Sequence, residues 1–174
     1  MMKKITALLA LILILAISSC DVESSASGYQ VYFACDMAYH PYNHISSFGQ
    51  FITVKRKGTK SYEVTDANGH TTTHNLTEIE LRTPYHYGLG GLIIGTPSTS
   101  DGNIWVYDWA CPACEMRGDK YRLEIARDGK GLATCPTCHN MYDLNSEGIP
   151  VKGKSRPLWR YNYIISGTTI LIRN

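Results

Sequence analysis

The chain has 174 residues, of which 18% are charged, with 17 basic and 15 acidic side chains. Lys3 and Lys4 supply the whole basic surplus, so the remaining chain is formally neutral and offers no basic stripe for nucleic acid. This length suffices for one domain with a buried core, and 15 glycines and 12 tyrosines without long helical periodicity favour an all-β domain.

The first 19 residues have the order of a secretory signal peptide. Lys3 and Lys4 precede an apolar run over 5–17, which is too short to span a bilayer, and small residues follow it. Ile17-Ser18-Ser19-Cys20 resembles the bacterial lipobox, in which the cysteine is lipidated and becomes the first mature residue. The sequence therefore predicts a cell-envelope lipoprotein that is anchored to the membrane through Cys20 and faces the periplasm or the cell surface. An ordinary secretory signal is the alternative.

Residues 20–28 are polar and serine-rich, which is typical of a flexible tether, and the folded domain is expected over 29–174. Tyr29, Val31 and Phe33 alternate with less apolar residues and predict a strand. Cys35 follows, and it is the cysteine left over once the lipid cysteine and the two later pairs are assigned. We expect it to be a small buried apolar side chain.

His40 and His44 lie in a predicted loop. Pro41 between them argues against one helical face, and no carboxylate or thiol pattern lies nearby in the sequence, so no metal role is expected. Strands are predicted over 51–56 and 61–65, with a hairpin turn at Asn68-Gly69.

A glycine-rich segment precedes the apolar run Leu92-Ile93-Ile94 and predicts a bulge or a close approach of two backbones. A strand over 104–109 then leads directly into Cys111. Alternation of Tyr121, Leu123 and Ile125, followed by an Asp-Gly turn, predicts further strand structure, and 158–174 has the pattern of a final hairpin.

Two C-P-x-C pairs dominate the second half of the chain: Cys111 with Cys114 and, after twenty residues, Cys135 with Cys138. Two residues between cysteines allow a tight turn to direct both sulfurs at one point, and the second pair completes a tetrahedron. Proline after the first cysteine of each pair fixes φ and stiffens the turn. The spacing predicts a four-thiolate metal site, with His139 a less favoured ligand. Disulfides are the alternative that an oxidising envelope permits.

The segments around both pairs resemble Rieske-type 2Fe-2S domains. The similarity covers the lead into the first cluster loop, the second loop with its exit, and the last strands: Gly90 to Ile94, Asp101-Gly102, 105–112, 134–139, Tyr142 to Leu144, Pro157-Leu158 and 161–172. This resemblance implies a β-sandwich with a small metal-binding subdomain, about 105–158, formed by two cysteine-containing loops.

The ligands depart from the Rieske pattern, which takes one cysteine and one histidine from each loop. Cys111 and Cys135 match the two family cysteines, but Ala113 and Cys138 stand where the two histidines belong. His139 comes one place late. The degenerate set is therefore expected to present four sulfurs.

Three functions stay open. A 2Fe-2S cluster on four thiolates would transfer electrons at a potential lower than Rieske values. Zn²⁺ on the same thiolates would fix the loops without redox chemistry. A thiol–disulfide protein is third, but its reactive pair would begin a helix, and no such helix is expected. Without a catalytic motif, an electron-transfer or structural module with an unknown protein partner is expected rather than a stand-alone catalyst.

Overall fold

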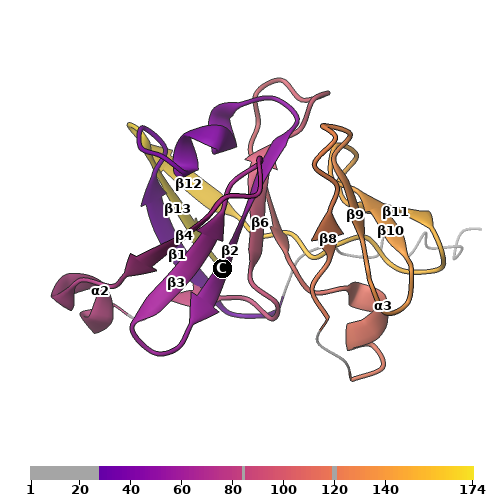
Figure 1. Cartoon of the computed structure of the whole chain (residues 1–174), viewed down its shortest axis with the longest axis horizontal. Coiled ribbons are helices and arrows are strands. Elements are labelled where there is room, and N and C mark those ends of the chain that lie inside the picture. The colour runs from indigo at the N-terminus through magenta and orange to yellow at the C-terminus, as the bar shows by residue number, and fades with distance from the viewer. Residues whose placement is uncertain (1–27, 84, 119–120) are drawn as a thin grey trace, which may run out of the picture.

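A computed structural model of the chain describes residues 28–83, 85–118 and 121–174. The predicted signal peptide, the lipidation site Cys20 and nearly all of the tether lie outside these residues. Within the described part, antiparallel strands form three sheets (Figure 1). None of the helices in this part has the length and apolar character needed to cross a bilayer.

The largest sheet has the strand order β4-β3-β2-β6-β7. Its strands are β2 (Gln50–Lys57), β3 (Ser61–Thr65), β4 (Thr71–Asn75), β6 (Leu92–Thr96) and β7 (Trp105–Asp108). A second sheet has the order β12-β13-β1-β5 and consists of β1 (Val31–Asp36), β5 (His86–Tyr87), β12 (Tyr163–Ser166) and β13 (Thr169–Arg173). The strands predicted over 29–33, 51–56, 61–65 and 104–109 and the final hairpin are present in these two sheets, whereas the alternation over 121–125 yields only the two-residue strand β8 (Glu124–Ile125) of the third sheet.

The two larger sheets pack face to face around one apolar core. Val31 and Phe33 from β1 and Ile170 and Ile172 from β13 meet residues of β2, β3, β6 and β7 there. Cys35 belongs to the same core and is 7% exposed, as expected for a small apolar side chain. Burial raises the pKa of its thiol to about 12, so this cysteine is an unreactive thiol at neutral pH.

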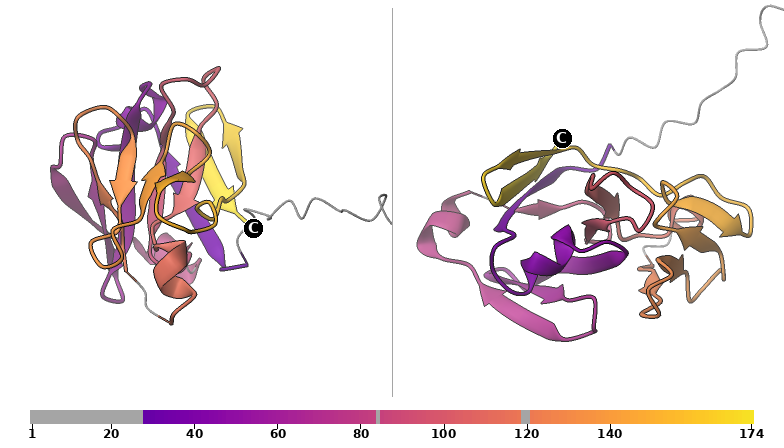
Figure 2. Two further views of the ribbon diagram at one scale, coloured as in Figure 1. Left: turned by 90° about the vertical axis from the view of Figure 1, so that its right-hand side faces the viewer. Right: turned by 90° about the horizontal axis from the view of Figure 1, so that it is seen from above.

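The third sheet is small and carries the cysteine loops. Its order is β11-β10-β9-β8, from β8 (Glu124–Ile125), β9 (Leu132–Thr134), β10 (Met141–Asp143) and β11 (Ile149–Lys152). It lies beyond β6 on the opposite side from the sandwich core (Figures 1 and 2). The Rieske-like arrangement that the sequence predicted, a β-sandwich with a small subdomain of two cysteine loops, is therefore confirmed.

Double burial of the central strands joins the two parts of the molecule. Ile52 and Ile94 face the sandwich core, while Phe51 and Ile93 pack with the cysteine loops in a second core. β6 is buried along its whole length. This is why 92–94 is a continuous apolar run rather than an alternating one.

Three short helices were not predicted: η1 (Tyr42–Ser46), α2 (Glu78–Arg82) and α3 (Pro112–Glu115). α2 buries no residue, so it leaves no apolar periodicity, but Thr77 and Glu80 form a capping box that a sequence search could have found. The expectation that no helix begins at a cysteine pair is wrong. α3 begins at Pro112, directly after Cys111, and proline is favoured in the first turn of a helix.

Asp108, at the end of β7, is a buried carboxylate that ties three segments together. It accepts hydrogen bonds from the backbone N–H groups of Leu89 (2.6 Å), Gly90 (2.9 Å) and Ala110 (2.8 Å), and from the Tyr161 hydroxyl (2.6 Å). Burial raises its pKa above the usual range, and the hydrogen bonds oppose that rise. The carboxylate thus fixes the backbone one residue before Cys111.

The glycine-rich segment lies close against this carboxylate. A Cβ on Gly90 would clash with the backbone of Ala110, and one on Gly88 (φ +68°) would clash with Asp108 and Tyr161. The close backbone approach predicted from the glycine run is therefore present, and it requires glycine for steric reasons.

We expect Asp108→Asn to lower the free energy of unfolding by about 2 kcal/mol, because an amide –NH₂ would face N–H donors that then lose their acceptor. The exposed Asp101 supplies the matched control, Asp101→Asn, which should change little. Urea unfolding of both variants checks this. Equal effects would contradict the structural role of Asp108.

Candidate metal centre

The first cysteine loop continues directly from β7. The backbone N–H of Cys111 donates to the Tyr121 carbonyl (2.8 Å), and the Cys111 carbonyl accepts from the N–H groups of Cys114 (3.2 Å) and Glu115 (3.0 Å). Cys111 is thus the N-cap of α3, and Cys114 lies on the same helical turn. Both sulfurs are carried by a backbone that is fixed at each end.

The second loop follows β9. Cys135 N–H donates to the Asn140 carbonyl (2.9 Å), and His139 N–H donates to the Cys135 carbonyl (3.0 Å). His139 has a left-handed backbone with φ +58°, and its side chain is exposed. The tight turn therefore directs Cys135 and Cys138 inward and leaves His139 at the surface.

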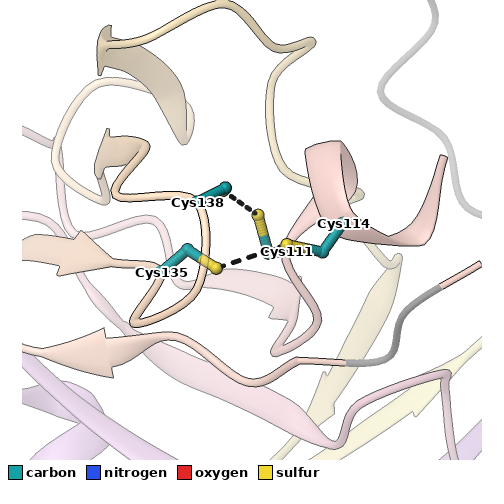
Figure 3. Close-up of side chains that lie close together, drawn as sticks. All are labelled: Cys111, Cys114, Cys135 and Cys138. Atoms are coloured by element: carbon teal, nitrogen blue, oxygen red, sulfur yellow. Dashed lines mark hydrogen bonds between the residues drawn. The ribbon is translucent and has the colours of Figure 1, made fainter. Parts of the chain in front are cut away.

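The four predicted cysteines meet at one point (Figure 3). Their sulfur atoms all lie within 4.8 Å of one another, and His139 is not part of the cluster. Cys111 Sγ lies 3.6 Å from Cys138 Sγ, and Cys114 Sγ lies 3.5 Å from Cys135 Sγ. Each of these contacts joins one loop to the other, so the cluster bridges the two loops.

The two cross-loop separations are close to the sulfur spacing around one tetrahedral metal ion. Zn–S bonds of about 2.3 Å in a tetrahedron place the sulfurs about 3.8 Å apart. A 2Fe-2S cluster divides its four thiolates between two bridged irons, so the two halves must stand farther apart than the edges of one tetrahedron. The cluster is also too wide for disulfides, whose sulfurs are about 2.05 Å apart, and all four cysteines are free.

Burial sets the protonation of the cysteines in the absence of a metal. It raises the pKa of Cys111 to about 12 and raises that of Cys114 as well. Burial also acts to raise the pKa of Cys138. Hydrogen bonds from the Asn140 N–H and the neighbouring thiols outweigh this effect, so that the pKa of Cys138 is lowered. A buried cluster of this kind holds several protons that a metal ion must displace.

Two side chains outside the ligand set contact the sulfurs. The Tyr142 hydroxyl lies 3.3 Å from Cys111 Sγ and 2.9 Å from Ser155 Oγ, and Arg117 Nη2 donates to Cys114 Sγ at 3.5 Å. The Tyr142 hydroxyl donates to Ser155 Oγ here. A metal-bound thiolate can only accept hydrogen bonds, so with an ion bound to Cys111 the tyrosine would donate to that sulfur and accept from Ser155. Sequence analysis named Tyr142 for its resemblance alone and missed Arg117, which lies three residues after Cys114 in the turn that follows α3.

A scan against protein-family models found no match to the chain, and a search of the curated proteins found none. Among solved structures, the chain is similar to the cyanobacterial plasma membrane Rieske protein PetC3 from Synechocystis PCC 6803. The identity is 19% and the TM-score 0.40, over 56% of this chain and 95% of that chain. It is also similar to the ferredoxin of carbazole 1,9a-dioxygenase from Nocardioides aromaticivorans IC177, with 14% identity and a TM-score of 0.33 over 47% and 73% of the two chains. At these TM-scores neither similarity bears on the metal, the partner or the membrane.

Tyr142→Phe should weaken metal retention at least about tenfold, since partners of metal ligands typically contribute 10–100-fold to affinity. Competition with a chromophoric chelator measures this. Tyr39→Phe, at a side chain that is 69% exposed, is the control and should retain wild-type affinity. Wild-type affinity in Tyr142→Phe would show that its hydroxyl does not support the thiolate.

Proposed function

We propose that Cys111, Cys114, Cys135 and Cys138 hold one Zn²⁺ ion that fastens the two loops of a Rieske-like module. The observation that carries this proposal is the clustering of all four sulfurs within 4.8 Å. Zn²⁺ supplies no redox chemistry, and a closed set of four thiolates leaves no position for a substrate. The module would then serve as a stable binding or structural domain of an envelope lipoprotein with a protein partner.

A 2Fe-2S centre that transfers electrons is the second candidate. The resemblance to Rieske loops supports it, and so does the position of Cys138, which is half-buried whereas the other three cysteines are buried. One edge of the centre therefore lies near the surface, where a redox partner could approach. Protein purified from its own envelope separates the candidates: a colourless protein with stoichiometric zinc supports the first, and a brown protein with iron and sulfide supports the second.

The ligand set can be tested with two variants side by side. Cys135→Ser should abolish stoichiometric metal and make 111–139 protease-sensitive while the sandwich strands persist, because a buried thiolate site without its metal is costly and the sandwich core is separate. His139→Ala should retain the metal. Metal content and limited proteolysis measure both, and loss of metal in His139→Ala with retention in Cys138→Ala would overturn the four-sulfur assignment.

The membrane anchor is an independent part of the proposal. Cys20 ends a basic, apolar and small-residue sequence, and its lipidation would hold the module at the membrane. Cys20→Ala should move the protein from the membrane to the soluble envelope fraction, and mass spectrometry of the wild type should detect the acyl chains. Membrane retention of the variant, together with an unacylated wild type, would refute the anchor.

A further inference from the structure

A second group of metal-ligating side chains lies away from the cysteines. His40, His44 and Asp66 each offer one ligand atom, and these three atoms lie within 4.8 Å of one another. His44 is on η1, the violet helix at the upper left of Figure 1, whereas α3 and the cysteine centre lie at the lower right. Sequence analysis expected no metal role for the two histidines because no carboxylate was nearby. The fold supplies that carboxylate from the β3–β4 turn.

Asp66 is positioned with one carboxylate oxygen directed toward the histidines. Its side chain is 1% exposed, and Oδ1 accepts hydrogen bonds from the backbone N–H groups of Asn68 and His70, both at 2.9 Å. Burial acts to raise its pKa, but the hydrogen bonds from His70 and Asn68 outweigh this and hold the pKa below the usual range. The group is therefore an ionised carboxylate at neutral pH, and its Oδ2 faces the histidines.

His44 has the ring orientation of a metal ligand. Its Nδ1 lies 2.6 Å from the Gln50 side-chain oxygen, which only accepts, so Nδ1 carries the proton and Nε2 presents a lone pair. That Nε2 is 3.9 Å from Asp66 Oδ2, which is too long for a hydrogen bond. Nitrogen and oxygen ligands about 2.0–2.1 Å from one tetrahedral ion stand roughly 3.4 Å apart, so a small side-chain shift closes the site around an ion.

We propose that His40, His44 and Asp66 form a second site for a divalent transition-metal ion such as Zn²⁺. Imidazole and carboxylate ligands suit this class of ion and differ chemically from the four thiolates. His70 Nδ1 lies 3.3 Å from Asp66 Oδ2, but His70 is not one of the three clustered residues. Arg127 is the nearby cation: it donates to the Asp66 backbone carbonyl (2.7 Å), and its side chain is exposed to water. A bound ion would join η1 to the β3–β4 turn.

Zinc titration of the full-length protein in detergent tests the site, with Zn²⁺ alone as the probe. The wild type should bind one more equivalent of Zn²⁺ per protein molecule than the variants His44→Ala and Asp66→Asn. Asn preserves an oxygen that can accept the turn hydrogen bonds, so Asp66→Asn should stay folded. His86→Ala removes a half-buried histidine outside the cluster and should bind as the wild type does. Since the readout is a difference of one equivalent, it does not depend on which metal the cysteines hold. Equal stoichiometry in all four proteins would overturn the proposal.

Gln50 variants test the ring orientation separately. Gln50→Leu removes the acceptor for His44 Nδ1–H and should weaken binding at this site about tenfold or more, whereas Gln50→Glu keeps an acceptor and should restore the affinity. Calorimetric titration with Zn²⁺ gives both values. Equal affinities in the two variants would contradict the proposed geometry.

Discussion

Burial of the central strands on both faces is the constraint on which the rest of the structure depends. β6 packs Ile94 into the sandwich core and Ile93 against the cysteine loops, so a single strand belongs to two apolar cores. Asp108 then fixes the chain where it leaves the sheet and enters the first loop. The cysteine cluster is thereby built on a surface that the sandwich core stabilises.

The two cysteine loops contribute little regular structure of their own. α3 has four residues, and β9 and β10 have three each. Such short elements bury too little apolar surface to order themselves, and small domains commonly use a metal for this purpose. The sulfur contacts between the two loops are therefore the interactions that can hold the loops together. If an ion bound four thiolates there, Tyr142 and Arg117 would donate hydrogen bonds to their negative charge.

The sequence was sufficient for features with a local or periodic signal. Alternation and turn residues predicted β3 at its observed bounds, and the cysteine spacing predicted which four sulfurs would meet. It failed where an element is short and without apolar periodicity, or where a feature depends on tertiary contact. α2 buries nothing and so has no periodicity, and α3 is too short for one. Asp66 could not be linked to His40 and His44, because only the folding of separate loops brings them together.

X-ray absorption at the zinc and iron edges tests the central claim most directly. His44→Ala protein purified from its own envelope should be used, so that only the thiolate centre contributes. We predict zinc with a single shell of four sulfurs at about 2.3 Å and no neighbouring metal. An iron signal with a second iron as scatterer, or a shell of mixed nitrogen and sulfur, would contradict a single ion held by four thiolates.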